Sequence, residues 1–120
     1  MNLKQIVTTL GLQSLTSAAA DQEQVEITRA HASDLLSDVL ANAPAGGVLL
    51  TIQVHLNVIA VALHAMQVAV IFTSGMTPEE AVRNKAIEEK IPLFASKEST
   101  FDMAGKLYAL GIRGKDERMA

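Results

Sequence analysis

The hydrophobic and polar positions of this chain change their period twice between Gly47 and Gly75. Residues 47–53 and 68–73 are short, nearly continuous apolar runs bounded by turn residues, a pattern typical of strands buried on both faces. Between the runs, polar and small residues at spacings of three, four and three mark one stripe of a helix: Asn57, Ala60, His64 and Gln67. The pattern predicts a strand, a helix and a second strand parallel to the first.

A membrane-spanning helix is the alternative interpretation of this segment. No charged residue occurs between Asp38 and Glu79, and residues 48–72 are long enough for a bilayer crossing, which takes about 20 residues. The stretch is nevertheless interrupted by Thr51, Gln53, His55, Asn57, His64 and Gln67. A helix facing lipid has no use for these side chains, so we favour a soluble unit and expect no membrane partner.

The first third of the chain predicts one helix and two short strands. Residues 3–10 have apolar positions at helical spacing, and Gly11 follows where a left-handed helix cap belongs. Residues 12–16 and 25–28 are strand candidates on either side of a polar turn at residues 21–24.

A second helix is predicted to begin after Ser33 or Asp34, either of which could cap it, and to end near Asn42 before Pro44. Its predicted apolar face consists of Leu35, Leu36, Val39 and Leu40.

Two further helix starts follow the central segment. Thr77 precedes Pro78 and Glu80, which together form a strong start signal for a helix that runs to about Lys90. Ser99 precedes the last predicted helix, whose apolar positions are Phe101, Ala104, Leu107, Tyr108 and Leu110.

The order of these elements predicts a small three-layer α/β domain with a mainly parallel sheet, preceded by the short N-terminal helix and strands. Three parallel strands are expected at residues 47–53, 68–73 and 91–95, each followed by a helix. At 120 residues the chain fits one domain, which we place at residues 1–112 with a polar tail at residues 113–120.

Charge and cysteine content narrow the expected partners. Ten Lys and Arg against thirteen Asp and Glu give a net charge of -3, the wrong sign for capturing a phosphate backbone, so no nucleic acid is expected. The chain has no cysteine, which fits a reducing compartment, and its first ten residues do not resemble a signal peptide. These features indicate the cytoplasm.

The sequence contains little that indicates a catalytic site or a metal site. The three histidines, His31, His55 and His64, lack the spacing of a metal pair on one helix face, so no metal and no cofactor are expected. Ser33 with a histidine and Asp34 or Asp38 could form a triad on paper, but no nucleophile elbow orients them. We therefore expect a protein that is not an enzyme.

Polar residues at the ends of the predicted strands are the better candidates for a ligand site. The carboxyl ends of parallel strands, next to helix N-termini, are where open α/β sheets bind ligands and anions. The candidates are Thr51, Gln53, His55 and Asn57 after the first strand, and Thr73, Ser74 and Gly75 after the second. The alternative is that these side chains only cap the helix and close turns.

Self-association is predicted from the helix at residues 57–67. Apart from its polar stripe, this helix is apolar around its circumference, which is more than one sheet face can bury. A second copy of the chain would cover the surplus, and a symmetric dimer is the commonest such arrangement.

Several segments together resemble the DRTGG domain family, from Leu3 to about Ile112. They are Leu3-Lys4-Gln5-Ile6-Val7 with Leu10-Gly11-Leu12, Ala32-Ser33-Asp34-Leu35-Leu36, Thr51-Ile52-Gln53, Ile71-Phe72-Thr73-Ser74-Gly75 and Ile91-Pro92-Leu93. The chain is similar as well to the N-terminal domain of HPr kinase/phosphorylase, in a stand-alone short form. The string that names the family is absent, and only Thr73-Ser74-Gly75 resembles its glycine turn.

The resemblance implies a regulatory or assembly role beside other proteins. It does not imply kinase activity, because the chain has no phosphate-binding P-loop sequence. We therefore expect a non-catalytic homodimeric module that regulates a partner protein, such as a neighbouring enzyme or kinase system. The alternative is a sensor for a nucleotide or another phosphate-containing metabolite.

Overall fold

The computed structural model describes residues 1–17 and 20–116 and contains one mixed five-stranded sheet. The strand order is β1-β5-β4-β3-β2, and every neighbouring pair is parallel except β1 with β5. The strands are β1 (Gln13–Ser14), β2 (Ala30–Ala32), β3 (Val48–Thr51), β4 (Ala69–Phe72) and β5 (Leu93–Ala95).

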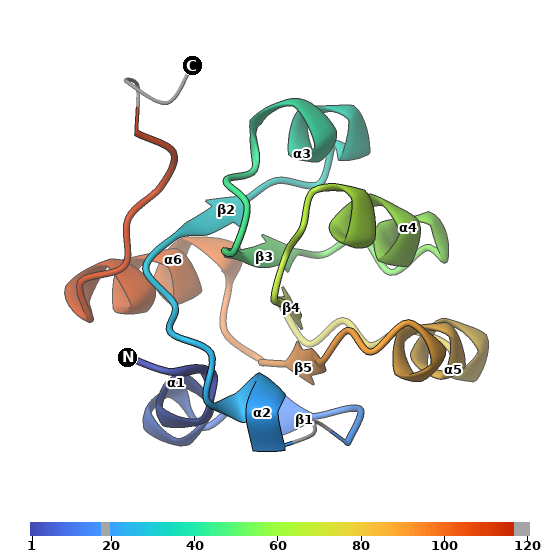
Figure 1. The fold of residues 1–120 in the computed structure, drawn as a ribbon, viewed down its shortest axis with the longest axis horizontal. Coiled ribbons are helices and arrows are strands. Elements are labelled where there is room, and N and C mark those ends of the chain that lie inside the picture. Colours follow the sequence, from blue (N-terminus) through green and yellow to red (C-terminus); the bar gives the residue numbers. More distant parts are fainter. Residues whose placement is uncertain (18–19, 117–120) are drawn as a thin grey trace.

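Helices cover both faces of this sheet and make a three-layer α/β domain (Figure 1). One face carries α3 (Leu36–Asn42), α4 (Asn57–His64) and α5 (Glu80–Glu88), the three crossovers between parallel strands. The other carries α1 (Leu3–Leu10) and α6 (Thr100–Ala109). A short helix, α2 (Ala20–Glu23), lies beside α1. The predicted fold class is confirmed.

The core consists of two apolar layers, one on each side of the sheet. Leu49 and Val70 pack among the side chains of α3, α4 and α5. Their neighbours Leu50 and Ile71 point to the other side and pack with α1 and α6. Strands β3, β4 and β5 are buried at every position, which explains their continuous apolar runs.

Several predicted elements are confirmed. The strand, helix and strand of the central segment are β3, α4 and β4. Gly11 ends α1 in the left-handed conformation with φ 61°. Ser99 is the N-cap of α6, and its side chain accepts a hydrogen bond from the amide of Asp102.

The edges of the sheet differ from the prediction. The parallel part has four strands, because Ala30–Ala32 forms β2 alongside β3. Residues 25–28 contribute only an isolated bridge between Glu26 and Asn2, and the polar turn predicted at residues 21–24 belongs largely to α2. The sequence pattern does not reveal β2, because this strand is only three residues long and lies half-exposed at the edge of the sheet.

Two predicted caps are wrong. Helix α5 begins at Glu80, and Glu79 occupies its N-cap position without a side-chain cap hydrogen bond. Thr77 therefore does not cap this helix. Helix α3 likewise has Leu35 at its N-cap and no side-chain cap hydrogen bond.

The predicted apolar faces of two helices also differ from the structure. Leu35 and Leu40 are exposed rather than part of an apolar face, and Phe101 of α6 is exposed as well.

Helix α4 buries more of its apolar surface than the sequence suggests. It lies between α3 and α5 as well as against the sheet, and buries Val58, Ile59, Val61 and Ala62. Within the described residues, no helix is both long and apolar enough to cross a bilayer.

Candidate functional site

The ends of β4 and β5 are the place where the chain leaves the sheet in two directions. After β4 it turns to α5 on one face, and after β5 it turns to α6 on the opposite face (Figure 1). In open α/β sheets, a crevice forms outside the carboxyl ends of strands where successive connections diverge in this way, and ligands bind there.

A cavity of about 510 Å³ lies at this divergence. Two backbone hydrogen bonds join the loops that border it: the amide of Ser74 donates to the carbonyl of Glu98 at 2.7 Å, and the amide of Gly75 donates to the carbonyl of Ser96 at 3.0 Å. The lining residues are Leu10, Gly11, Gln13, Gly75, Thr77, Ala95, Ser96, Lys97, Glu98 and Lys106.

Two lysines and one glutamate give this cavity its charge. The Nζ atom of Lys106 lies 2.5 Å from Oε1 of Glu98. Lys97 is exposed, and none of the ion pairs among the described residues includes it. Thr77 and Ser96, two hydroxyl-bearing residues, also line the cavity. Two ammonium groups, hydroxyls and a carboxylate suit an anionic ligand that also offers hydrogen-bond donors.

Three of the four residues predicted at the end of the first strand brace the loop that follows β3. Thr51 Oγ1 accepts a hydrogen bond from the amide of Gln53 at 3.0 Å, Gln53 Oε1 accepts from the amide of His55 at 3.3 Å, and His55 Nδ1 accepts from the amide of Asn57 at 3.1 Å. Each polar side chain thus holds the backbone two residues further along. These contacts match the alternative interpretation of the four residues, in which their side chains close turns of the backbone.

Thr51 is further tied to Asp34. Its hydroxyl is fully buried and lies 2.9 Å from Oδ1 of Asp34, which also accepts the amide of Ile52 at 2.8 Å. Asp34 therefore connects the end of β2 to the end of β3 and does not cap α3.

The three predicted residues after β4 have separate environments. Thr73 is buried, and its Oγ1 lies 2.6 Å from Oγ1 of Thr100. Ser74 and Gly75 are exposed and adopt positive φ angles of 59° and 72°. Of the three, Gly75 lines the cavity between β4 and β5.

Gln53 and His55 line a different cavity of about 420 Å³, between the β3–α4 loop and the start of α5. Glu79 and Val82 contribute to its other wall. The seven predicted residues therefore do not form one cluster: Gln53 and His55 line one cavity and Gly75 another, while Thr51 is bonded to Asp34 and Thr73 to Thr100. Their role in binding a ligand stays a prediction.

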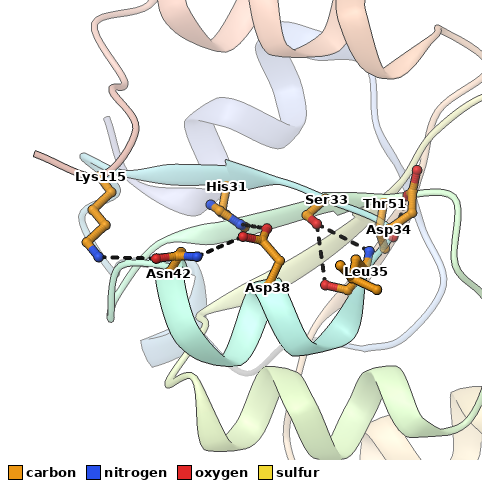
Figure 2. A network of polar contacts seen from close by, with 8 residues as sticks. All are labelled: His31, Ser33, Asp34, Leu35, Asp38, Asn42, Thr51 and Lys115. Atoms are coloured by element: carbon orange, nitrogen blue, oxygen red, sulfur yellow. Dashed lines mark hydrogen bonds and ion pairs between the residues drawn. The ribbon is translucent and has the colours of Figure 1, made fainter. Parts of the chain in front are cut away.

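A separate polar network lies between β2 and α3 (Figure 2). Nε2 of His31 is 2.8 Å from Oδ2 of Asp38, Nδ2 of Asn42 donates to Oδ1 of Asp38 at 2.8 Å, and Lys115 Nζ donates to Asn42 Oδ1 at 3.3 Å. The hydrogen bonds from Asn42 and then His31 lower the pKa of Asp38 to about 2. This network joins the segment after α6 to the edge of the sheet.

Among the described residues, no group of three or more His, Asp or Glu side chains is placed to hold a metal ion.

The sequence prediction did not include Lys97, Glu98 and Lys106. The same rule about strand ends, applied to the third predicted strand at residues 91–95, leads directly to Lys97 and Glu98. Lys106 lies one turn and a half into α6, and only the packing of that helix brings it to the cavity.

Comparison with known proteins gives a likeness in fold. No protein-family profile matches the chain, and no curated protein matches it. A solved structure does: the CBS and DRTGG domains of the regulatory region of Clostridium perfringens pyrophosphatase, in complex with the activator diadenosine tetraphosphate. The TM-score is 0.71 at 13% sequence identity.

This chain has a DRTGG-like fold. The match covers 87% of this chain and 44% of the other, so the chain spans less than half the length of that neighbour. At such low identity the likeness concerns the fold alone, and the DRTGG-like fold agrees with the three layers and the parallel sheet described above.

Proposed function

We propose that this chain is a non-catalytic regulatory module that binds a small phosphate-containing ligand in the cavity between the ends of β4 and β5. The observation that carries the proposal is the position of that cavity, at the divergence of two strand connections and beside Lys97 and Lys106. Ammonium groups and loop amides are the ordinary partners of phosphate in proteins.

The likeness to the pyrophosphatase region supports a regulatory or ligand-sensing role. That region is regulatory and was solved with a nucleotide activator, and it includes a domain of the fold adopted here. The cavity lining contains no aromatic side chain, so we expect recognition of the phosphate groups to contribute more than stacking on a base. Nucleotides, pyrophosphate and acyl phosphates are the ligands to screen.

Isothermal titration calorimetry with pyrophosphate and with ATP tests the proposal. Lys97→Gln should weaken binding at least tenfold, because it removes the cavity lysine whose positive charge is not offset by the Lys106–Glu98 ion pair. Lys90→Gln is the matched control: it makes the same charge change just before β5, whereas Lys97 lies just after it. The control should bind as wild type.

Two results would contradict this proposal. One is the absence of binding to every phosphate compound in the screen, and the other is equal weakening by both lysine substitutions. Equal weakening would indicate a general effect of charge rather than a site at the carboxyl ends of the strands.

We also propose that the module forms a homodimer and acts on a partner protein in the cytoplasm. Exposed apolar side chains on helices of both faces support association, and the lack of cysteine is compatible with a reducing compartment. Light scattering at micromolar concentration should give the mass of two chains. A monomer mass would count against the dimer and leave the ligand proposal standing.

A further inference from the structure

An exposed stripe runs along α6 on the side that faces away from the sheet. Phe101, Gly105 and Tyr108 are four and three residues apart, which places them within about 60° of one another around the helix. Phe101 is 85% exposed and Tyr108 is 59% exposed. Two of the four aromatic side chains of the chain thus lie on one line of one helix.

Gly105 at the centre of this stripe has no explanation within a single chain. A Cβ atom built on it meets no other atom within 4 Å, and its backbone is not in the left-handed region. Glycine in a helix interior is less stable than alanine, so neither space nor conformation requires it here. A glycine does allow another backbone to approach closely.

A cavity of about 240 Å³ opens beside the stripe, between α6 and β2. Its walls include Ala104, Leu107 and Tyr108 of α6, and the guanidinium of Arg113 lies over the ring of Tyr108 at 3.7 Å. The same surface therefore carries a projecting aromatic side chain, Phe101, and a largely apolar hollow less than two turns further along the helix.

The charges beside the stripe favour a second copy of α6 in antiparallel orientation. Asp102 and Lys106 lie on the same flank of the helix, and Lys106, half-exposed, also pairs with Glu98 of its own chain. A two-fold axis perpendicular to the helix at Gly105 places Asp102 of each copy beside Lys106 of the other. In a parallel pair, this flank would instead face the side of the partner that carries Ala104, and the opposite charges would not meet.

We propose that α6 is the homodimer interface and that two copies cross antiparallel at Gly105, with Phe101 of each copy packed beside Tyr108 of the other at the 240 Å³ cavity. This inference rests on the homodimer of the proposed function and names its surface. A projecting side chain and a cavity on one patch make that patch self-complementary, as a two-fold interface requires.

Sedimentation velocity over a concentration series tests the interface. Phe101→Ala should raise the dissociation constant of the dimer at least about tenfold, the effect expected for a central aromatic anchor. Leu63→Ala is the matched control, because Leu63 is an exposed apolar residue of α4 on the opposite face of the sheet. Its dissociation constant should stay within a factor of two of wild type.

Gly105→Ala tests whether Gly105 serves the dimer interface or only the structure of the single chain. Alanine should raise the melting temperature of the dilute monomer and at the same time weaken the dimer. Asp102→Lys should also weaken the dimer, because it sets like charges beside each other across the antiparallel pair.

The outcomes distinguish this inference from the homodimer itself. A wild-type chain that stays monomeric at the highest soluble concentration contradicts the homodimer. A dimer that is unaffected by Phe101→Ala but weakened by Leu63→Ala overturns the α6 interface alone and assigns the contact to α4.

Discussion

The carboxylate of Asp34 accepts a hydrogen bond from the buried hydroxyl of Thr51 at 2.9 Å and thereby ties the end of β2 to the end of β3. The same oxygen accepts the amide of Ile52, so one side chain satisfies two donors of the neighbouring strand end. The loop that follows is braced further by Thr51 and Gln53. This part of the sheet edge is therefore built for rigidity.

Removing that carboxylate should be costly for folding. We expect Asp34→Ala to lower the free energy of unfolding by about 1–3 kcal/mol, because it leaves the Thr51 hydroxyl buried without its acceptor. Urea denaturation of Asp34→Ala, Thr51→Val and the double variant measures this. If the losses of the two single variants simply add, the two side chains are not coupled and this account of the loop is wrong.

The two serine and threonine positions that precede helices α6 and α5 should behave differently. Ser99→Ala should cost about 1 kcal/mol, because the Ser99 hydroxyl accepts the amide of Asp102 at 3.1 Å. Thr77→Ala should change stability by less than about 0.5 kcal/mol, since α5 starts beyond it at Glu80. Thermal unfolding of both variants makes the comparison, and equal losses would contradict the helix starts described here.

The pKa of Asp38 predicts a change of stability at acidic pH. Because the folded-state pKa is about 2 and the ordinary value is 3.8, the stabilisation is present above about pH 4 and is lost as the pH falls through 2. Asn42→Ala should raise this pKa, since it removes the largest cause of the shift. Carboxyl NMR titration measures it. Lys115→Ala, which removes a contact to Asn42 and leaves the Asn42–Asp38 hydrogen bond in place, should have a smaller effect, and an unchanged pKa in Asn42→Ala would refute the assignment.

The central strands and their helix could be predicted because their signals are local. Val48–Thr51 and Ala69–Phe72 are buried on both faces, so every residue is apolar or a small hydroxyl, and the helix between them has its own period. Strand β2 escaped prediction because Ala30, His31 and Ala32 have little strand preference by themselves and pair only through β3.

The candidate site was harder to predict, because it depends on which face each helix covers. The sequence places Lys97 after a strand, but only the opposite directions of α5 and α6 make a cavity there. The sequence places Thr51, Gln53 and His55 at the end of a strand, and their hydrogen bonds to nearby amides become clear only from the backbone of the loop.

The most direct test of the ligand site is an amide NMR titration of the labelled protein with pyrophosphate. The account predicts shifts that saturate and that concentrate at Gly75 and at residues 95–98, with the amides of residues 53–57 little changed. Saturable shifts centred instead on residues 53–57, or no shifts anywhere, would contradict a phosphate site between β4 and β5.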